Sequence, residues 1–282
     1  MRFALKTAPQ HTKWADMLAV WQAADDIDFF ESGWTFDHFY PIFSDSTGPC
    51  FEGWTVTTAL AQATKRLRVG VLVTGMPYRH PAVLAKMAAT LDVVSNGRLE
   101  LGVGAGWNQE EADAYGIDIH STLTDRFDAF DEACEMIVGL LTNTTTSFKG
   151  RFYELTEARC EPKPVQQPHP PICIGGTGER RTLRSVARFA QHWNYPGGPI
   201  DQFKHKLDVL REHCATEGRN ADDIMISTHL RLDESGDTGS LVAQAEQYAD
   251  AGLDLGIVYL PPPHTPAVLE SVVKALDAFR TT

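Results

Sequence analysis

Short apolar stretches of four to eight residues alternate with longer amphipathic stretches along most of the chain, and this order restricts the fold more than any other property. Several short stretches are apolar almost throughout, as is typical of parallel strands that are covered on both faces. Eight strands that alternate with helices close most economically into a (βα)₈ barrel, an α/β fold of the TIM type, and the alternative is a doubly wound open sheet. The expected strands are Phe3–Lys6, Phe29–Trp34, Leu67–Thr74, Leu99–Gly104, Pro171–Gly175, His192–Tyr195, Ile224–Leu230 and Leu253–Leu260.

Three of the intervening stretches carry the clearest helical pattern. Residues 80–95, 124–142 and 265–280 place apolar side chains at the three- and four-residue spacing of one helix face. The first of these is expected to end at Asn96-Gly97, a pair that commonly stops a helix.

The length of 282 residues suits one domain, because a barrel of this type takes roughly 250 residues. We therefore expect a single domain over residues 1–282. Residues 143–170 interrupt the alternation with a polar segment, a possible hairpin at Phe148–Leu155 and a proline-rich stretch. They are expected to form an excursion between the fourth and fifth βα units.

The composition excludes several classes of protein. Hydrophobic residues make up 43% and charged residues 22%, which is the mix of a soluble globular protein. The formal charge of −12 argues against nucleic acids and anionic membranes as partners, since both bind dense positive surfaces. The five cysteines include no C-x-x-C pair and fit free thiols in a reducing compartment. With no apolar run long enough for a signal peptide or a membrane span, the expected location is cytoplasmic.

Functional residues of such a barrel gather at the C-terminal ends of its strands. Asp37 and His38 follow the second expected strand, and a histidine beside a carboxylate can donate or accept a proton near neutral pH. The Asp37 carboxylate is expected to fix the tautomer of His38, although a purely structural histidine is the alternative. No metal site is expected, because no two histidines lie four residues apart and no H-E-x-x-H motif occurs.

Two glycine-rich turns follow the fourth and fifth expected strands. A dinucleotide-binding G-x-G-x-x-G motif is absent, since its last glycine would fall on Trp107 when counted from Gly102 and on Arg181 when counted from Gly176. Glycines at such turns either let backbone N–H groups approach an anion or a flat ring, or merely make the turns tight.

Taken together, the chain resembles the luciferase-like superfamily, in its branch of F420-dependent oxidoreductases. The resemblance covers roughly the first two thirds of the chain. It is carried, in order, by Asp37-His38-Phe39, Tyr78–Lys86, Ser95–Trp107 and Ile174–Gly178.

This resemblance implies a barrel that holds the deazaflavin F420, or alternatively FMN, at its mouth. It implies a catalytic proton donor or acceptor at His38, a non-prolyl cis peptide near Leu72-Val73 behind the ring, and a cofactor phosphate on the turn Gly175–Gly178. Glu179 weighs against the phosphate, since an acid there competes with an anion. The residues expected at the cofactor are Asp37, Leu72, Val73, Thr74, Gly104, Gly106, Trp107, Asn108, Gly175, Gly176, Thr177, Gly178 and Arg181.

Two positions depart from the sugar-phosphate dehydrogenases of this family, which carry a tryptophan where Ile42 stands and an acid where Trp107 stands. Glu110 and Glu111 either replace the acid or form the solvated first turn of a helix. The acidic tail of F420 needs cations along its exit, and Arg79, Arg180 and Arg181 are the candidates.

The expected function is hydride transfer between F420 and a small organic substrate. Besides this substrate, the only partner expected is a second copy of the chain, in a homodimer. The alternatives are an FMN-dependent monooxygenase, a flavin-binding barrel without catalysis, and a barrel lyase or hydrolase unrelated to flavins.

Overall fold

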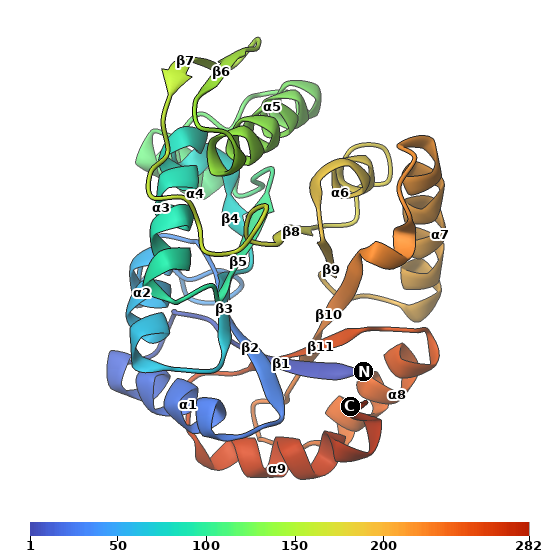
Figure 1. Ribbon diagram of the computed structural model, residues 1–282. Coiled ribbons are helices and arrows are strands. Elements are labelled where there is room, and N and C mark those ends of the chain that lie inside the picture. The colour runs from blue at the N-terminus through green and yellow to red at the C-terminus, as the bar shows by residue number, and fades with distance from the viewer. Residues whose placement is uncertain (282) are drawn as a thin grey trace.

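The computed structural model, which describes residues 1–281, is a closed barrel of parallel strands surrounded by helices (Figure 1). The sheet order is β3-β2-β1-β11-β10-β9-β8-β5-β4, and an additional pairing of β3 with β5 closes the ring. The barrel predicted from the alternation is therefore confirmed, and the open sheet is not formed. The barrel strands are β1 (Arg2–Thr7), β2 (Phe30–Thr35), β3 (Arg68–Val71) with its continuation β4 (Thr74–Gly75), β5 (Leu99–Gly104), β8 (Ile172–Gly175), β9 (His192–Tyr195), β10 (Met225–Arg231) and β11 (Leu255–Leu260).

The helices lie on the outside of the ring (Figure 1). The first predicted helix corresponds to α3 and the second to α5. Helix α3 starts on a proline, and it ends just before Asn96 and Gly97, which have positive φ angles of 57° and 78°. The third is shorter than predicted, because α9 ends at Leu276 and continues as a 3₁₀ turn over Asp277–Phe279. The helices are α1 (Trp14–Asp26), α2 (Gly53–Ala63), α3 (Pro81–Val94), α4 (Gln109–Tyr115), α5 (Leu123–Thr142), α6 (Thr182–Phe189), α7 (Ile200–Thr216), α8 (Gly239–Asp250) and α9 (Ala267–Leu276).

The predicted excursion leaves the barrel after α5. Its hairpin consists of the antiparallel strands β6 (Thr146–Lys149) and β7 (Glu154–Ala158), and it projects beyond α5 at the top of Figure 1. The proline-rich stretch then returns the chain to β8. The hairpin is a few residues longer on both sides than the sequence pattern suggested.

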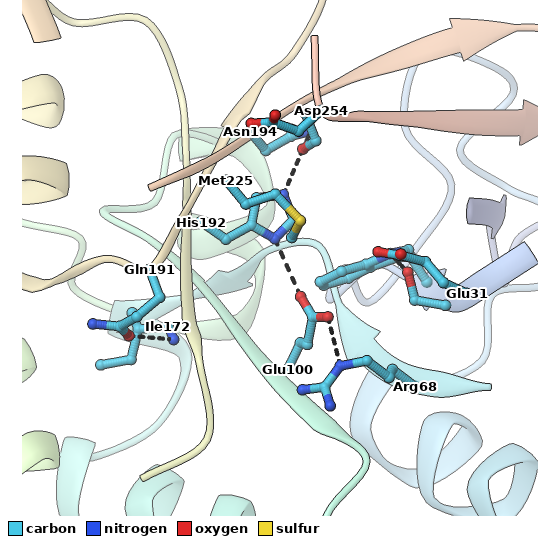
Figure 2. A network of polar contacts seen from close by, with 12 residues as sticks. Glu31, Arg68, Glu100, Ile172, Gln191, His192, Asn194, Met225 and Asp254 are labelled. Atoms are coloured by element: carbon cyan, nitrogen blue, oxygen red, sulfur yellow. Dashed lines mark hydrogen bonds and ion pairs between the residues drawn. The ribbon is translucent and has the colours of Figure 1, made fainter. Parts of the chain in front are cut away.

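A buried polar network joins the first residues of several barrel strands (Figure 2). The Glu100 carboxylate accepts a hydrogen bond from Arg68 Nε at 2.8 Å and lies 3.2 Å from Nδ1 of the fully buried His192. His192 Nε2 in turn lies 2.6 Å from Ser227 Oγ. Burial alone would raise the pKa of Glu100, but His192 and Arg68 together lower it below its usual value. This end of a barrel serves stability rather than chemistry.

None of the helices within residues 1–281 is long and apolar enough to cross a membrane. The two ends of the chain lie next to each other (Figure 1), where the Met1 amino group donates to the Phe279 carbonyl oxygen at 2.9 Å. The first and last barrel strands, β1 and β11, are hydrogen-bonded along their full length.

Candidate active site

A cavity of about 410 Å³ opens at the C-terminal ends of the barrel strands. Its size falls in the range of small-molecule binding sites. Nine of the residues predicted at the site line this cavity: Asp37, His38, Leu72, Val73, Gly104, Gly106, Trp107, Gly175 and Gly176.

The other five predicted residues do not line the cavity. Thr74 Oγ1 accepts a hydrogen bond from Trp54 Nε1 at 2.8 Å, and the Asn108 side chain caps α4. Arg181 pairs with Asp128 at 2.6 Å. The remaining two, Thr177 and Gly178, belong to the turn that leads into α6.

His38 belongs to a compact set of hydrogen-bonded side chains on the cavity wall. Its Nδ1 lies 2.7 Å from Oε2 of Glu111, which also accepts a hydrogen bond from the Tyr78 hydroxyl at 2.5 Å. The other carboxylate oxygen of Glu111 accepts from the backbone N–H of Phe39. Glu111 is fully buried and His38 is 8% exposed. The three groups come from the loop after β2, from the 3₁₀ turn after β4 and from the first turn of α4.

The carboxylate of Glu111 determines how His38 is protonated. Burial alone would raise the pKa of Glu111, but the hydrogen bonds from His38, Tyr78 and Phe39 together lower it, so the carboxylate is ionised at neutral pH. An ionised carboxylate only accepts hydrogen bonds, and His38 Nδ1 therefore carries a proton. In a neutral His38, Nε2 is then the unprotonated ring nitrogen.

The predicted partner of His38 is wrong. No hydrogen bond joins Asp37 to the imidazole in the described part of the chain; instead, both of its carboxylate oxygens accept from Arg79, at 2.6 and 3.0 Å. A bidentate guanidinium pair of this kind uses the two oxygens that would otherwise orient the histidine. The carboxylate that is hydrogen-bonded to His38 is that of Glu111. The sequence allowed Glu110 and Glu111 either as acids of the site or as a solvated helix turn; Glu111 is buried at the site, and Glu110 is exposed.

The same ion pairs alter the expectation for the F420 tail. The charges of Arg79 and Arg181 are neutralised by Asp37 and Asp128, so the structure disfavours both as tail contacts and leaves Arg180 as the exposed candidate. The objection from Glu179 weakens as well, because its carboxylate pairs with Lys206 at 2.5 Å.

Val73 lines the cavity between two glycines. A Cβ atom on Gly104 would lie 2.8 Å from one methyl group of Val73, and a Cβ on Gly175 would lie 3.1 Å from the other. Any residue other than glycine at positions 104 and 175 would displace the Val73 side chain. The peptide bond between Leu72 and Val73 is cis, as the family resemblance implied.

Two aromatic rings stand at the rim of the cavity. Trp107 stacks on Phe43 with ring centres 5.5 Å apart and an interplanar angle of 3°, and it meets the His38 ring edge-on at 5.6 Å. Phe43 is 87% exposed and Trp107 is 54% exposed. The site thus has an apolar rim next to its proton-carrying group.

The cysteine beside His38 is a neutral thiol. Cys50 Sγ lies 3.4 Å from the His38 carbonyl oxygen, and burial together with the charges of Glu111 and Asp37 raises its pKa to about 12. It is therefore no thiolate nucleophile. Within residues 1–281, no group of three histidine, cysteine or acidic side chains is placed to hold a metal ion.

Several lining residues escaped the sequence analysis. Tyr78 has no role in the sequence prediction, and no residue of β10 or β11 is among the predicted site residues. Lys6 carried a usable signal, since a lysine inside an apolar strand needs an explanation. The lining residues outside the predicted set include Lys6, Tyr78, His229, Arg231 and Tyr259.

Curated proteins with similar sequences include enzymes and uncharacterised chains. The FMNH₂-dependent dimethylsulfone monooxygenase of Pseudomonas putida is 32% identical over 168 residues, which are 59% of this chain and 45% of that protein. An uncharacterised protein of Mycobacterium tuberculosis is 32% identical over 170 residues, which are 60% of this chain and 58% of that protein. The matched part thus spans about half the length of these relatives.

Solved structures share the fold over the whole chain. An F420-dependent secondary alcohol dehydrogenase, in complex with an F420-acetone adduct, has a TM-score of 0.86 at 18% identity and covers 99% of both chains. The coenzyme F420-dependent tetrahydromethanopterin reductase of Methanopyrus kandleri has a TM-score of 0.82 at 18% identity, again over 99% of both. A monooxygenase of Streptomyces bottropensis reaches 0.76 at 19% identity, over 99% of this chain and 97% of its own.

The family description matches far more of the chain than the individual relatives do. The profile of the luciferase-like monooxygenases covers residues 1–258, which include all of the strands around the cavity except the last two residues of β11. This chain belongs to the luciferase-like monooxygenase family.

Proposed function

We propose that this protein is an oxidoreductase that transfers a hydride between the deazaflavin F420 and a small organic substrate, with His38 as the proton donor or acceptor. The observation that carries the proposal is the hydrogen-bonded set of His38, Glu111 and Tyr78 on the cavity wall. A hydride cannot leave a carbon that bears a hydroxyl group unless a base takes the hydroxyl proton, and this set supplies one.

The cavity has the features that a flat ring with a phosphate tail requires. Glycines at positions 75, 104, 106, 175 and 176 line it and let the backbone approach closely. Val73 provides an apolar surface for the ring. The turn Gly175–Gly178 leads into α6, whose first N–H groups have no side-chain cap and would hold the phosphate.

When bound, the deazaflavin supplies the hydride chemistry. The protein handles the proton: His38 Nε2 takes it from the substrate hydroxyl or returns it to a carbonyl oxygen. Glu111 keeps Nδ1 protonated and stabilises the imidazolium that forms. Tyr78 and the Phe39 amide hold Glu111 in place.

The second candidate is an FMN-dependent monooxygenase, which the similarity to the dimethylsulfone monooxygenase supports. The buried acid–base set favours the dehydrogenase instead, as do the F420-dependent enzymes among the solved structures of the same fold. A single domain over residues 1–282, a homodimer and a cytoplasmic location remain proposals from the sequence.

Fluorescence titration of the purified protein with F420 and with FMN tests this choice. We expect F420 to bind more tightly, and the F420-loaded protein to turn over a secondary alcohol or its ketone. Clearly tighter binding of FMN would select the monooxygenase. Binding of neither cofactor would overturn both functions.

Replacing Gly176 by aspartate is expected to weaken cofactor binding by about tenfold or more, which is about 1.4 kcal/mol. Gly176 has a φ of 126°, which side-chain-bearing residues rarely adopt, and its Cβ would lie 3.2 Å from Thr182 Cγ2. The new carboxylate would also repel the phosphate. Gly252→Asp is the matched control, because its φ is 83° and its Cβ would meet no atom within 4 Å. Unchanged cofactor affinity of Gly176→Asp would place the phosphate elsewhere.

A further inference from the structure

Lys6, Tyr259 and Arg231 lie side by side on neighbouring strands at the mouth of the barrel. The register pairs Lys6 of β1 with Tyr259 of β11, and Tyr259 with Arg231 of β10. All three side chains line the cavity. The Lys6 Nζ atom lies 5.2 Å from the centre of the Tyr259 ring, and the guanidinium carbon of Arg231 lies 5.0 Å from it. The two cations therefore face the same space.

Neither cation is neutralised by a carboxylate within the described part of the chain. This is not for lack of acids, because 37 acidic residues face 25 basic ones. Arg79, at the same mouth, has the Asp37 carboxylate as its partner. Two basic side chains of the cavity wall therefore have no carboxylate partner within residues 1–281.

The contacts of Lys6 leave one of its hydrogens free. Its Nζ donates to the Leu72 carbonyl oxygen at 2.9 Å and lies 3.4 Å from His229 Nε2. Burial, with help from Lys6 and Arg231, lowers the pKa of His229 well below its usual value, so the neutral ring accepts at Nε2. The third ammonium hydrogen of Lys6 is left for a molecule in the cavity. Burial and the charge of Arg231 lower the pKa of Lys6 to about 7, and a bound anion would reverse that effect.

We propose that Lys6 and Arg231 form a subsite that binds the carboxylate of an acidic organic substrate, in the same cavity as His38. The inference rests on the proposed function and names the substrate class for it. The planar guanidinium of Arg231 suits the two oxygens of a carboxylate, and Lys6 adds a charge at a desolvated position. Neutral substrates would leave both cations without a partner, so the subsite selects for acids.

The cofactor phosphate is the other anion that could occupy this place. The turn proposed for it follows β8, and β9 separates β8 from β10 in the sheet. His38 follows β2, which is the direct neighbour of β1 and of Lys6. Lys6 therefore lies on the side of the cavity where His38 acts. Arg231 lies between Lys6 and the turn proposed for the phosphate, because one strand separates β10 from β8 and two strands separate it from β2.

Calorimetric titration with benzoate and with benzamide, its neutral counterpart, tests the subsite. The protein is first saturated with F420 or FMN, whichever binds more tightly. We expect benzoate to bind wild type at least about tenfold more tightly than benzamide. Lys6→Met and Arg231→Met should each remove most of that difference. Lys149→Met, which changes an exposed lysine of β6, should leave benzoate binding unaltered.

Three results would overturn the subsite. The first is that benzoate binds wild type no more tightly than benzamide does. The second is that both variants keep the wild-type affinity for benzoate. The third is a loss of cofactor affinity of about tenfold in both variants, which would assign the cations to the cofactor phosphate. Circular dichroism checks folding, and if Lys6→Met does not fold, Arg231→Met decides alone, since Arg231 is exposed at the end of its strand. If neither cofactor binds, the proposed function fails, while titration of the cofactor-free protein still tests the subsite.

Discussion

Replacing Glu111 by glutamine is expected to lower turnover by about 1,000- to 10,000-fold while cofactor affinity stays within about tenfold. The amide has one oxygen to accept hydrogen bonds where the carboxylate accepts three, and it cannot stabilise a protonated His38. Loss of the carboxylate also lets Nε2 carry the proton, which removes the base from the cavity. Steady-state kinetics with the F420-loaded protein measures the effect.

Glu110→Gln is the matched control, because Glu110 is the exposed neighbour on the same helix turn. Its turnover should equal that of wild type. If His38 and Glu111 act as one unit, the double variant His38→Ala/Glu111→Gln will be no slower than His38→Ala alone. Additive losses would show that Glu111 acts independently of His38.

Replacing Glu100 by glutamine is expected to lower the free energy of unfolding by about 3 kcal/mol at neutral pH. The change leaves His192 and Arg68 without the carboxylate between them, inside the barrel. Urea unfolding measures the loss, and Glu154→Gln, at an exposed position of β7, should change nothing. An equally small effect of both substitutions would contradict a stabilising role of the network in Figure 2.

The lowered pKa of Glu100 also predicts how the stability difference between wild type and Glu100→Gln depends on pH. The pKa of Glu100 is lower in the folded than in the unfolded chain, so its contribution to stability is fully present above the unfolded value, near 4.5. That contribution is lost as the pH falls through the folded value. The gap in stability between wild type and Glu100→Gln should therefore shrink in acid.

The barrel was predictable because each strand is encoded locally, by a short apolar run that ends at a turn. The position of His38 at the cavity was predictable for the same reason, since it lies shortly after such a run. Its partner was not. Asp37 is next to it in the sequence, whereas Glu111 lies 73 positions away and is brought near by the closure of β2, β3 and β5.

The local sequence pattern also gave no indication of which charged residues lie at the cavity. An acid in the first turn of a helix is usually solvated, and nothing near Glu111 shows that α4 turns it inward. Lys6 lies on the first strand of the chain, whereas Arg231 and Tyr259 lie on the last two, and the three meet because β11 pairs with both β1 and β10. Such clusters depend on the order of strands in the closed sheet, which a single sequence does not display.

The pairing of β1 with β11 also sets when the barrel can form. These strands are separated by about 250 positions, so their contact is the most non-local one in the sheet. During synthesis, β1 leaves the ribosome first and keeps one edge without a neighbour until the last strand arrives, and unpaired edges invite association with other chains. Helices α1 and α2 are synthesised early and can cover the growing sheet. The ring itself closes only in the final step, when β11 pairs with β1.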